Sequence, residues 1–331
     1  MSQVNQRLIA EKAKVSINTV SRALNDKPDV SSVTRKRVLK IAQQVGYVPN
    51  LLAKSLKSGQ SKTIGVVIPN LSNPFFNPVL RGIDDKLREQ GYNLMICNSN
   101  GDYRREEEAV VTLIQKRVDG VSLTPVGKRS LDISYLQKMS VPFVLMMSHF
   151  KVTDTDYVGF DDKMGAFLAT QHLMEKGHRR ILYIGGPPYF SLARDRLFGH
   201  KKALATYGIR IDRKLLRTAS PKLEEGFRIV RKILSEGLDF SAIAAFNDYL
   251  ALGAVKAIFE HGLKVPEDIA IVGYDDIEFA SLSIVPLTTI QLPKYLLGSK
   301  TAQLLLAKMR TKGTKPKKVL LKPQLKVRSS T

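Results

Sequence analysis

The sequence predicts two kinds of structure in one chain: a small all-α domain at the N-terminus and an α/β core with two parallel sheets. Two short helical segments joined by a tight turn lie within residues 5–25. From Thr63 onward, strands alternate with helices in two successive runs. At 331 residues, the chain is long enough for a core with an appended domain. Its 52 Lys and Arg against 30 Asp and Glu, a net charge of +22, favour a polyanionic partner.

The two N-terminal helices have the layout of a helix-turn-helix. We predict the first helix over residues 5–12 and a turn around Lys14 and Val15. Ser16 can cap the second helix, because its hydroxyl can accept a hydrogen bond from a free amide of the first turn. The second helix gathers its apolar residues on one stripe, namely Val20, Ala23 and Leu24. The opposite face then carries Ile17, Asn18, Ser21 and Arg22.

This outward face suits the major groove of DNA, where the second helix of such a motif places its early residues against base edges. Asn pairs with adenine, Arg pairs with guanine, and an Ile side chain can touch a thymine methyl. The base-reading candidates are therefore Ile17, Asn18 and Arg22. Polar side chains that can bind phosphate oxygens are the backbone candidates, namely Ser16, Thr19, Ser21, Asn25, Asn50 and Lys57.

A helical subdomain with a merely solvated polar face is the alternative for this region. Residues 1–62 hold twelve Lys or Arg and three Asp or Glu, and this density of positive charge is expected of a phosphate-binding surface. A third helix is predicted over residues 32–45 and ends at Gly46. Residues 49–56 have helical spacing but are too few to be stable alone. The N-terminal domain thus covers residues 1–58, and residues 59–62 form a polar linker.

The remaining chain, residues 63–331, has the pattern of parallel sheets covered by helices. The first run predicts strands over residues 64–68, 92–97, 120–124, 141–147 and 157–160, with helices over 76–90 and 104–116. The second run predicts strands over residues 180–184, 242–246 and 269–273, with helices over 164–176, 191–207, 224–235 and 248–261. Two runs indicate two lobes. Ligands of such sheets bind beyond the carboxyl ends of the strands, so the cleft between the lobes is the predicted ligand site.

Several short motifs follow one another along the whole chain. The N-terminal part carries Val15-Ser-x-x-Thr-Val-Ser-Arg22, Gly46-Tyr-x-Pro-Asn50 and Ala53-x-Ser-Leu56. The core carries Thr63-Ile-Gly-Val-Val67, Asn73-Pro-Phe-Phe76, Gly177-His-Arg179, Arg196-x-x-Gly199, Phe246-Asn-Asp248, Gly273-Tyr-Asp-Asp276, Pro286-Leu-Thr-Thr-Ile290 and Arg328-Ser-Ser-Thr331. In this order and spacing, they make the chain resemble the lactose-repressor (LacI/GalR) family of bacterial transcription regulators.

The resemblance implies a homodimer that binds a near-palindromic operator in double-stranded DNA, most often as a repressor. Residues 49–56 match the family's hinge helix, which orders on the operator, and Leu56 matches a leucine that wedges into the minor groove. The core resembles a type I periplasmic sugar-binding protein whose cleft binds a small effector, such as a sugar or a sugar derivative. Lobe 1 would comprise about residues 63–159 and 292–320, and lobe 2 about 160–290 and 321–331. Effector binding would shift the hinge helices between two states.

The matching effector positions are Asn73 and Phe75 on the first lobe, and Arg196, Asn247 and Asp275 on the second. Arg donates in a fork, Asp accepts from vicinal hydroxyls, and Asn does both, so these side chains suit a hydroxylated ligand. The alternatives are a turn-forming role for Asp275 and a surface ion pair for Arg196.

The chain also departs from the family pattern. Lys14 occupies the turn, where Gly or Asn is usual and a left-handed backbone costs less. Residues 146–149 lack the acid that often touches sugar hydroxyls, and Leu292 stands where a polar residue is common. A regulator without a small effector, acting constitutively or with a protein co-regulator, is therefore a second hypothesis.

Other classes of protein are disfavoured. The sequence contains no phosphate-binding glycine loop, nucleophile elbow or metal-spaced His or Cys, so we expect neither an enzyme nor a protein with a cofactor or metal. A solute-binding protein would need a signal peptide, and none precedes Ser2. No apolar run is long enough to span a bilayer. The single cysteine, Cys97, is consistent with a reducing compartment, so the predicted location is the cytoplasm.

Overall fold

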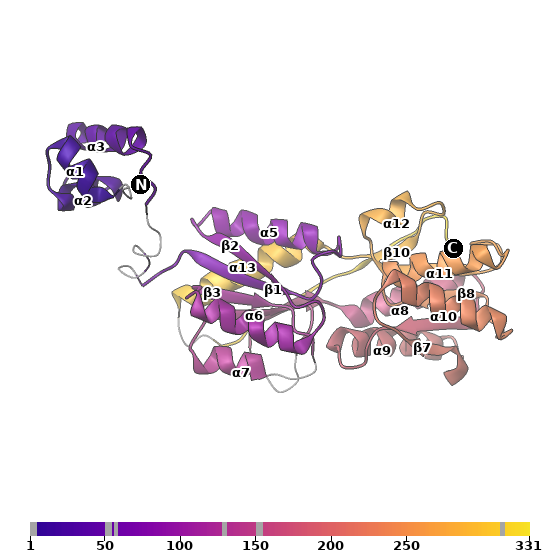
Figure 1. Cartoon of the computed structure of the whole chain (residues 1–331). Coiled ribbons are helices and arrows are strands. Elements are labelled where there is room, and N and C mark those ends of the chain that lie inside the picture. Colours follow the sequence, from indigo (N-terminus) through magenta and orange to yellow (C-terminus); the bar gives the residue numbers. More distant parts are fainter. Residues whose placement is uncertain (1–4, 50–54, 56–58, 128–130, 150–154, 312–314) are drawn as a thin grey trace. The chain divides into compact units, whose positions relative to one another are not determined.

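The computed structural model describes residues 5–49, 55, 59–127, 131–149, 155–311 and 315–331. It divides the chain into two compact units, Met1–Ser61 and Lys62–Thr331 (Figure 1). The first is all-α and the second is α/β with two sheets, as the sequence predicts. Among the described residues, no helix combines the length and the apolar character that crossing a membrane requires.

The N-terminal unit packs three helices, α1 (Gln6–Ala13), α2 (Ile17–Leu24) and α3 (Ser32–Gln44), around a small core of its own. Each helix begins at a capping side chain: Asn5, Ser16 and Ser31 accept hydrogen bonds from the backbone amides of Leu8, Thr19 and Thr34. The predicted stripe of α2 faces inward, since Val20 and Ala23 are buried. Ile9 and Val38, on the other two helices, complete the fully buried centre of this core.

Lobe 1 is built on a sheet with the strand order β11-β5-β4-β3-β1-β2, in which all neighbours are parallel. Its strands are β1 (Thr63–Ile68), β2 (Asn93–Asn98), β3 (Gly120–Leu123), β4 (Phe143–Met146), β5 (Tyr157–Phe160) and β11 (Lys318–Leu321). Its helices are α5 (Phe76–Arg88), α6 (Tyr103–Gln115), α7 (Leu131–Lys138) and α13 (Lys294–Arg310). In Figure 1, α5 and α13 cover one face of the sheet, and α6 and α7 cover the other.

Lobe 2 has a second sheet of order β12-β10-β9-β8-β6-β7, which is parallel except for the edge strand β12. Its strands are β6 (Ile181–Gly185), β7 (Leu216–Thr218), β8 (Ala242–Ala245), β9 (Ala270–Asp275), β10 (Thr288–Gln291) and β12 (Gln324–Lys326). Its helices are α8 (Asp162–Glu175), α9 (Ser191–Thr206), α10 (Leu223–Ser235), α11 (Asp248–Glu260) and α12 (Glu278–Leu282), and a short 3-10 turn, η1 (Arg213–Leu215), precedes β7.

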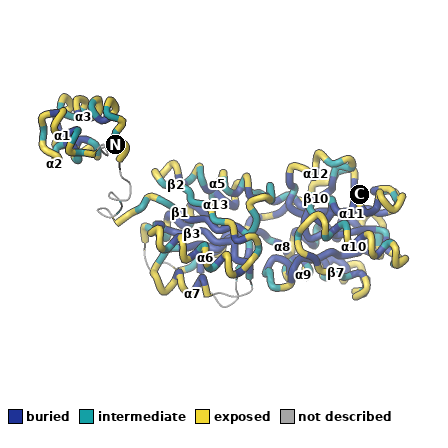
Figure 2. The backbone as a smooth tube through the Cα atoms, viewed as in Figure 1, coloured by how far each residue is buried: buried dark blue, intermediate teal, exposed yellow. Residues whose placement is uncertain are grey.

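The chain passes between the lobes three times, after β5, after β10 and after β11. The central strands are buried along their whole length, whereas the outer faces of the helices are exposed (Figure 2). Burial on both faces explains why these strands are continuous apolar runs in the sequence. Because the strands of each sheet are nearly all parallel, the loops that follow them gather at one edge, which is where sheets of this kind bind their ligands.

Candidate functional site

The DNA-reading candidates lie on the exposed face of α2. Ile17 is 50% exposed, and Asn18 and Arg22 are also exposed. Ser16 Oγ accepts the Thr19 amide at 3.0 Å and lies 2.9 Å from Thr19 Oγ1, so these two hydroxyls start the helix. This geometry leaves three side chains of different chemistry, one apolar, one amide and one guanidinium, on a face that can approach base edges.

Two candidates on this helix have partners within the unit. Arg22 forms an ion pair with Asp29, which lies in the loop between α2 and α3. The Asn25 side-chain amide donates to the Ser21 carbonyl at 2.8 Å and so closes the last turn of α2. The half-exposed pair of Arg22 and Asp29 holds the guanidinium in one place, while the amide of Asn25 is engaged in ending the helix.

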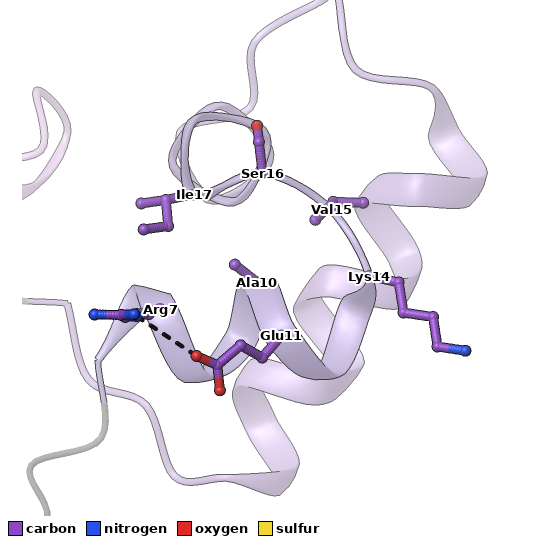
Figure 3. A pocket seen from close by; sticks show the side chains of 7 residues that line it. All are labelled: Arg7, Ala10, Glu11, Lys14, Val15, Ser16 and Ile17. Atoms are coloured by element: carbon purple, nitrogen blue, oxygen red, sulfur yellow. Dashed lines mark ion pairs between the residues drawn. The ribbon is translucent and has the colours of Figure 1, made fainter.

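The turn between α1 and α2 adopts the left-handed conformation despite the lysine. Lys14 has φ 51° and ψ 48°, and its amide donates to the carbonyls of Ala10 and Glu11. These bonds satisfy carbonyls that a helix end leaves free, which offsets the cost of the left-handed backbone. Figure 3 shows the Lys14 side chain extending away from the hollow that α1, the turn and Ile17 enclose. The helix-turn-helix geometry therefore forms with Lys at this position.

Three candidates from the predicted hinge region lie outside the described residues, namely Asn50, Leu56 and Lys57. The predicted hinge helix over residues 49–56 falls almost wholly in the same undescribed stretch. Their roles remain those implied by the family resemblance.

Within the core, Arg196 of α9 is the centre of a buried ionic cluster in lobe 2. It is 2% exposed, so the alternative of a surface ion pair is wrong. Its Nε donates to Asp162 Oδ1 at 2.8 Å, and its Nη1 donates to the Phe246 carbonyl at 2.5 Å. The guanidinium carbon lies 3.6 Å from the centroid of the Tyr274 ring, which supports one face of the cation. Arg196 is thus fixed, with Nη2 directed toward Asp275.

Asp275 ends β9, and its Oδ1 lies 3.7 Å from Arg196 Nη2. Its backbone has φ 111°, a region that residues other than Gly rarely occupy and that is found most often at functional sites. Burial raises the pKa of the Asp275 carboxyl to about 7, although Arg196 and Lys294 oppose this shift. Lys294, the first residue of α13, donates from Nζ to the carbonyls of Asp275 and Asp276 at 2.6 Å each.

The remaining effector candidates are each engaged by the protein. Asn247 is buried and caps α11, with Oδ1 accepting the Leu250 amide at 3.0 Å. Asn73 forms a tight turn by accepting the Phe75 amide at 3.0 Å. Phe75 is 1% exposed, and its ring centroid lies 6.0 Å from Lys294 Nζ. Lys294 therefore lies near Phe75 of lobe 1 while it binds the carbonyl groups that end β9 of lobe 2.

The two lobes also touch through hydroxyl groups at the strand ends. Ser148 of lobe 1 and Ser191 at the start of α9 bring their Oγ atoms within 3.1 Å. Ser191 Oγ also accepts the backbone amide of His149 at 3.0 Å. Where the family often has an acid, this chain therefore has a neutral contact between the lobes. Leu292 is 2% exposed and belongs to the hydrophobic core.

Sequence reasoning missed three residues of this region, namely Asp162, Tyr274 and Lys294. Asp162 follows the carboxyl end of β5, and Tyr274 stands inside the motif Gly273-Tyr-Asp-Asp276. The positions of both residues in the sequence could therefore have indicated that they lie near the site. Lys294 carried none, because its role depends on where α13 begins relative to β9.

Two family models match the chain, and several proteins are similar to it over nearly its full length. The model for bacterial regulatory proteins of the lacI family matches residues 8–50, and that for periplasmic binding proteins and the sugar binding domain of the LacI family matches residues 61–328. The ribose operon repressor of Escherichia coli (strain K12) is 36% identical over 323 residues, which cover 97% of this chain and 98% of that repressor.

Solved structures give the same result. The Lac repressor dimer bound to operator and the anti-inducer ONPF is 30% identical, with a TM-score of 0.89 over 99% of each chain. A LacI family transcriptional regulator from Enterococcus faecium with bound ribose is 30% identical, with a TM-score of 0.73 over 81% of this chain and 98% of that one. The two-lobed periplasmic-binding-protein fold predicted for the core is thereby confirmed.

Proposed function

The chain belongs to the LacI family of bacterial transcription regulators, and we propose that it is a repressor that binds a palindromic operator as a homodimer. A sugar or sugar derivative in the cleft between the lobes would control this binding. Ribose is the first candidate, since the E. coli relative is named as the ribose operon repressor and the E. faecium neighbour holds ribose. Because the target is bacterial DNA, the protein would act in the cytoplasm.

The observation that carries the effector role is the buried cluster around Arg196. A guanidinium fixed by Asp162 and stacked on Tyr274 is pre-organised, so a ligand does not have to order it. Arg196 and Asp275 together offer a donor fork and an acceptor, which is the complement of vicinal hydroxyls. In this proposal, Asn73, Phe75 and Asn247 complete the effector site. Lys294 positions Asp275 through the backbone.

The operator role is assigned to α2. Ile17, Asn18 and Arg22 would read bases, and the backbone contacts would come from Ser16, Thr19, Ser21, Asn25, Asn50 and Lys57. Leu56 would wedge into the minor groove at the operator centre. The proposal keeps residues 1–58 as the DNA-binding domain with a hinge at 49–56, residues 59–62 as linker, and residues 63–331 as the effector and dimerisation domain. It includes no catalytic step, cofactor or metal.

A thermal-shift screen with ribose, other sugars, sugar phosphates, sugar acids and nucleosides tests the effector role. A ligand at about 100 times its dissociation constant should stabilise the fold by roughly 2.7 kcal/mol. If no compound in the screen raises the unfolding temperature while operator binding is intact, the result would instead support a regulator that has no small effector.

Two variants are compared. Arg196→Met removes the buried guanidinium, and Lys202→Ala removes an exposed cation from the same helix. The first should lose the ligand-induced shift and the second should keep it. An Arg196→Met protein that is folded and still responds to the ligand would show that the effector binds elsewhere.

A further inference from the structure

All strands of the lobe 1 sheet start at the same edge, because every neighbouring pair is parallel. The register places Thr63 beside Asn93, Ile64 beside Gly120, and Tyr157 beside Lys318. The helices that precede these strands necessarily end at this edge too. The core unit itself begins there, at Lys62, so the edge carries the covalent connection to the DNA-binding unit.

This edge gathers positive charge from segments far apart in the sequence. Exposed cations stand at the start of β1, at the ends of α6 and α7, and before β11. They are Lys62, Lys116, Arg117, Lys138, Lys315 and Lys317, which we call the basic pole. Within the described parts of the chain, none of the six forms an ion pair. Four acids near this edge have other partners: Asp84 and Glu89 pair with cations of α5, Asp156 pairs with Lys308, and Asp119 accepts the backbone amide of Lys62 at 2.9 Å.

Helix dipoles alone do not account for this excess. Cations are favoured at any helix C-terminus, so the same edge of lobe 2 should be equally basic if the dipole were the cause. At that edge of lobe 2, however, the cations alternate with acids. Arg180 pairs with both Asp212 and Asp239, and Lys232 pairs with Glu236. Lys176, Arg210 and Lys264 of lobe 2 are unpaired among the described residues, but paired acids stand between them and offset part of the charge. The lobe 1 edge also differs in that it is joined to the DNA-binding unit.

We propose that the basic pole is a second DNA-binding surface, which contacts the phosphate backbone of the duplex held by the N-terminal unit. The proposal rests on the DNA-binding function argued above and adds the core itself to the interface. Lysine and arginine on an exposed edge bind phosphates without reading sequence, and each contact releases counterions. The pole would therefore strengthen binding to operator and to random DNA alike. It also gives a role to part of the net charge of +22.

The test compares two triple variants of the full-length protein. One carries Lys116→Ala, Lys138→Ala and Lys317→Ala, and the other carries Lys176→Ala, Arg210→Ala and Lys264→Ala on lobe 2. All six side chains are exposed and free of ion pairs among the described residues, so the two variants lose the same charge. Binding to a long mixed-sequence duplex, and to a palindromic site selected in vitro with the wild type, is measured by fluorescence anisotropy between about 50 and 200 mM salt.

The slope of log K against log salt should become shallower by about 2 to 5 units for the lobe 1 variant, if each dimer loses two to six contacts worth about 0.9 each. The lobe 2 variant should keep the wild-type slope. A third variant with Arg at the three lobe 1 positions should restore the slope and show that charge, not fold, was lost. Equal slopes for both alanine variants would overturn the proposal. Absence of any DNA binding by the wild type would instead refute the proposed function.

Discussion

At the scale of single residues, the ion pair between Arg196 and Asp162 is the most heavily buried charge interaction in the described structure. Their side chains are 3% and 4% exposed, and removal of one partner would leave the other charged in an apolar environment. Such losses typically cost about 3–5 kcal/mol, whereas exposed pairs contribute about 0–1 kcal/mol. We therefore expect Asp162→Ala to lower the free energy of unfolding by about 3–5 kcal/mol in urea denaturation.

The matched control for that measurement is Asp195→Ala on α9, which removes a partner of Lys163 at 3.6 Å on the surface. It should change the free energy of unfolding by less than about 1 kcal/mol. Similar losses in the two variants would contradict the central position given to Asp162.

Glu106 is a fully buried carboxyl at the start of α6. Its Oε2 accepts the Val126 amide at 2.6 Å, and burial, together with the nearby Asp132, raises the pKa of its carboxyl to about 9. The unfolded group titrates near 4.5, so between these values the folded state retains a proton that the unfolded state has lost. The contribution of Glu106 to stability is therefore greatest below the pKa of the unfolded state. It declines as the pH rises toward the pKa of the folded state.

Glu106→Gln keeps the shape of the side chain and removes the carboxyl group that titrates. The variant should be more stable than the wild type at pH 8, by about 1–4 kcal/mol, and the difference should shrink as the pH falls toward 5. Thermal unfolding across this pH range checks the effect. A difference that does not depend on pH would mean that Glu106 does not retain its proton.

At the scale of elements, the loop between α2 and α3 restrains Arg22, the arginine proposed to read bases. Asp29 pairs with Arg22 in the free protein, so the base contact proposed for Arg22 would compete with this ion pair. Asp29→Asn should strengthen binding to mixed-sequence DNA by up to about fivefold, because an exposed pair contributes about 0–1 kcal/mol. Glu11→Gln removes the same charge from α1, where it pairs with Arg7, and serves as the control. Equal gains in anisotropy titrations would assign the effect to net charge alone.

Strands and helices were predictable from the sequence where their own pattern determined them. The buried strand β1 and the capped helix α2 begin within one residue of the predicted positions, since apolar runs and caps are local signals. No element was predicted beyond residue 273, where the structure has α12, β10, α13, β11 and β12. The edge strands β11 and β12 are mostly exposed, and they form by pairing with the distant strands β5 and β10. Local periodicity cannot reveal such partners.

At the scale of the whole molecule, the proposed effector site depends on which strand ends lie together. The parallel-sheet rule by itself places Arg196 and Asp275 at one edge of the lobe 2 sheet. The rule does not predict the hydroxyl contact between the lobes, because Ser148 and Ser191 come from different sheets. That contact couples lobe 1 to lobe 2 through a single side chain, since Ser191 Oγ meets both Ser148 Oγ and the His149 amide.

Loss of this contact between the lobes should weaken effector binding. Ser191→Ala leaves the His149 amide without its partner when the lobes are together, a loss of about 1–3 kcal/mol. If the effector binds the state in which the lobes touch, the variant populates this state less. The apparent dissociation constant of the effector should then rise about 5- to 150-fold. Ser220→Ala, on an exposed loop, is the matched control. Calorimetric titration with the ligand found in the screen measures both. Unchanged affinity for Ser191→Ala would show that effector binding does not depend on this contact between the lobes.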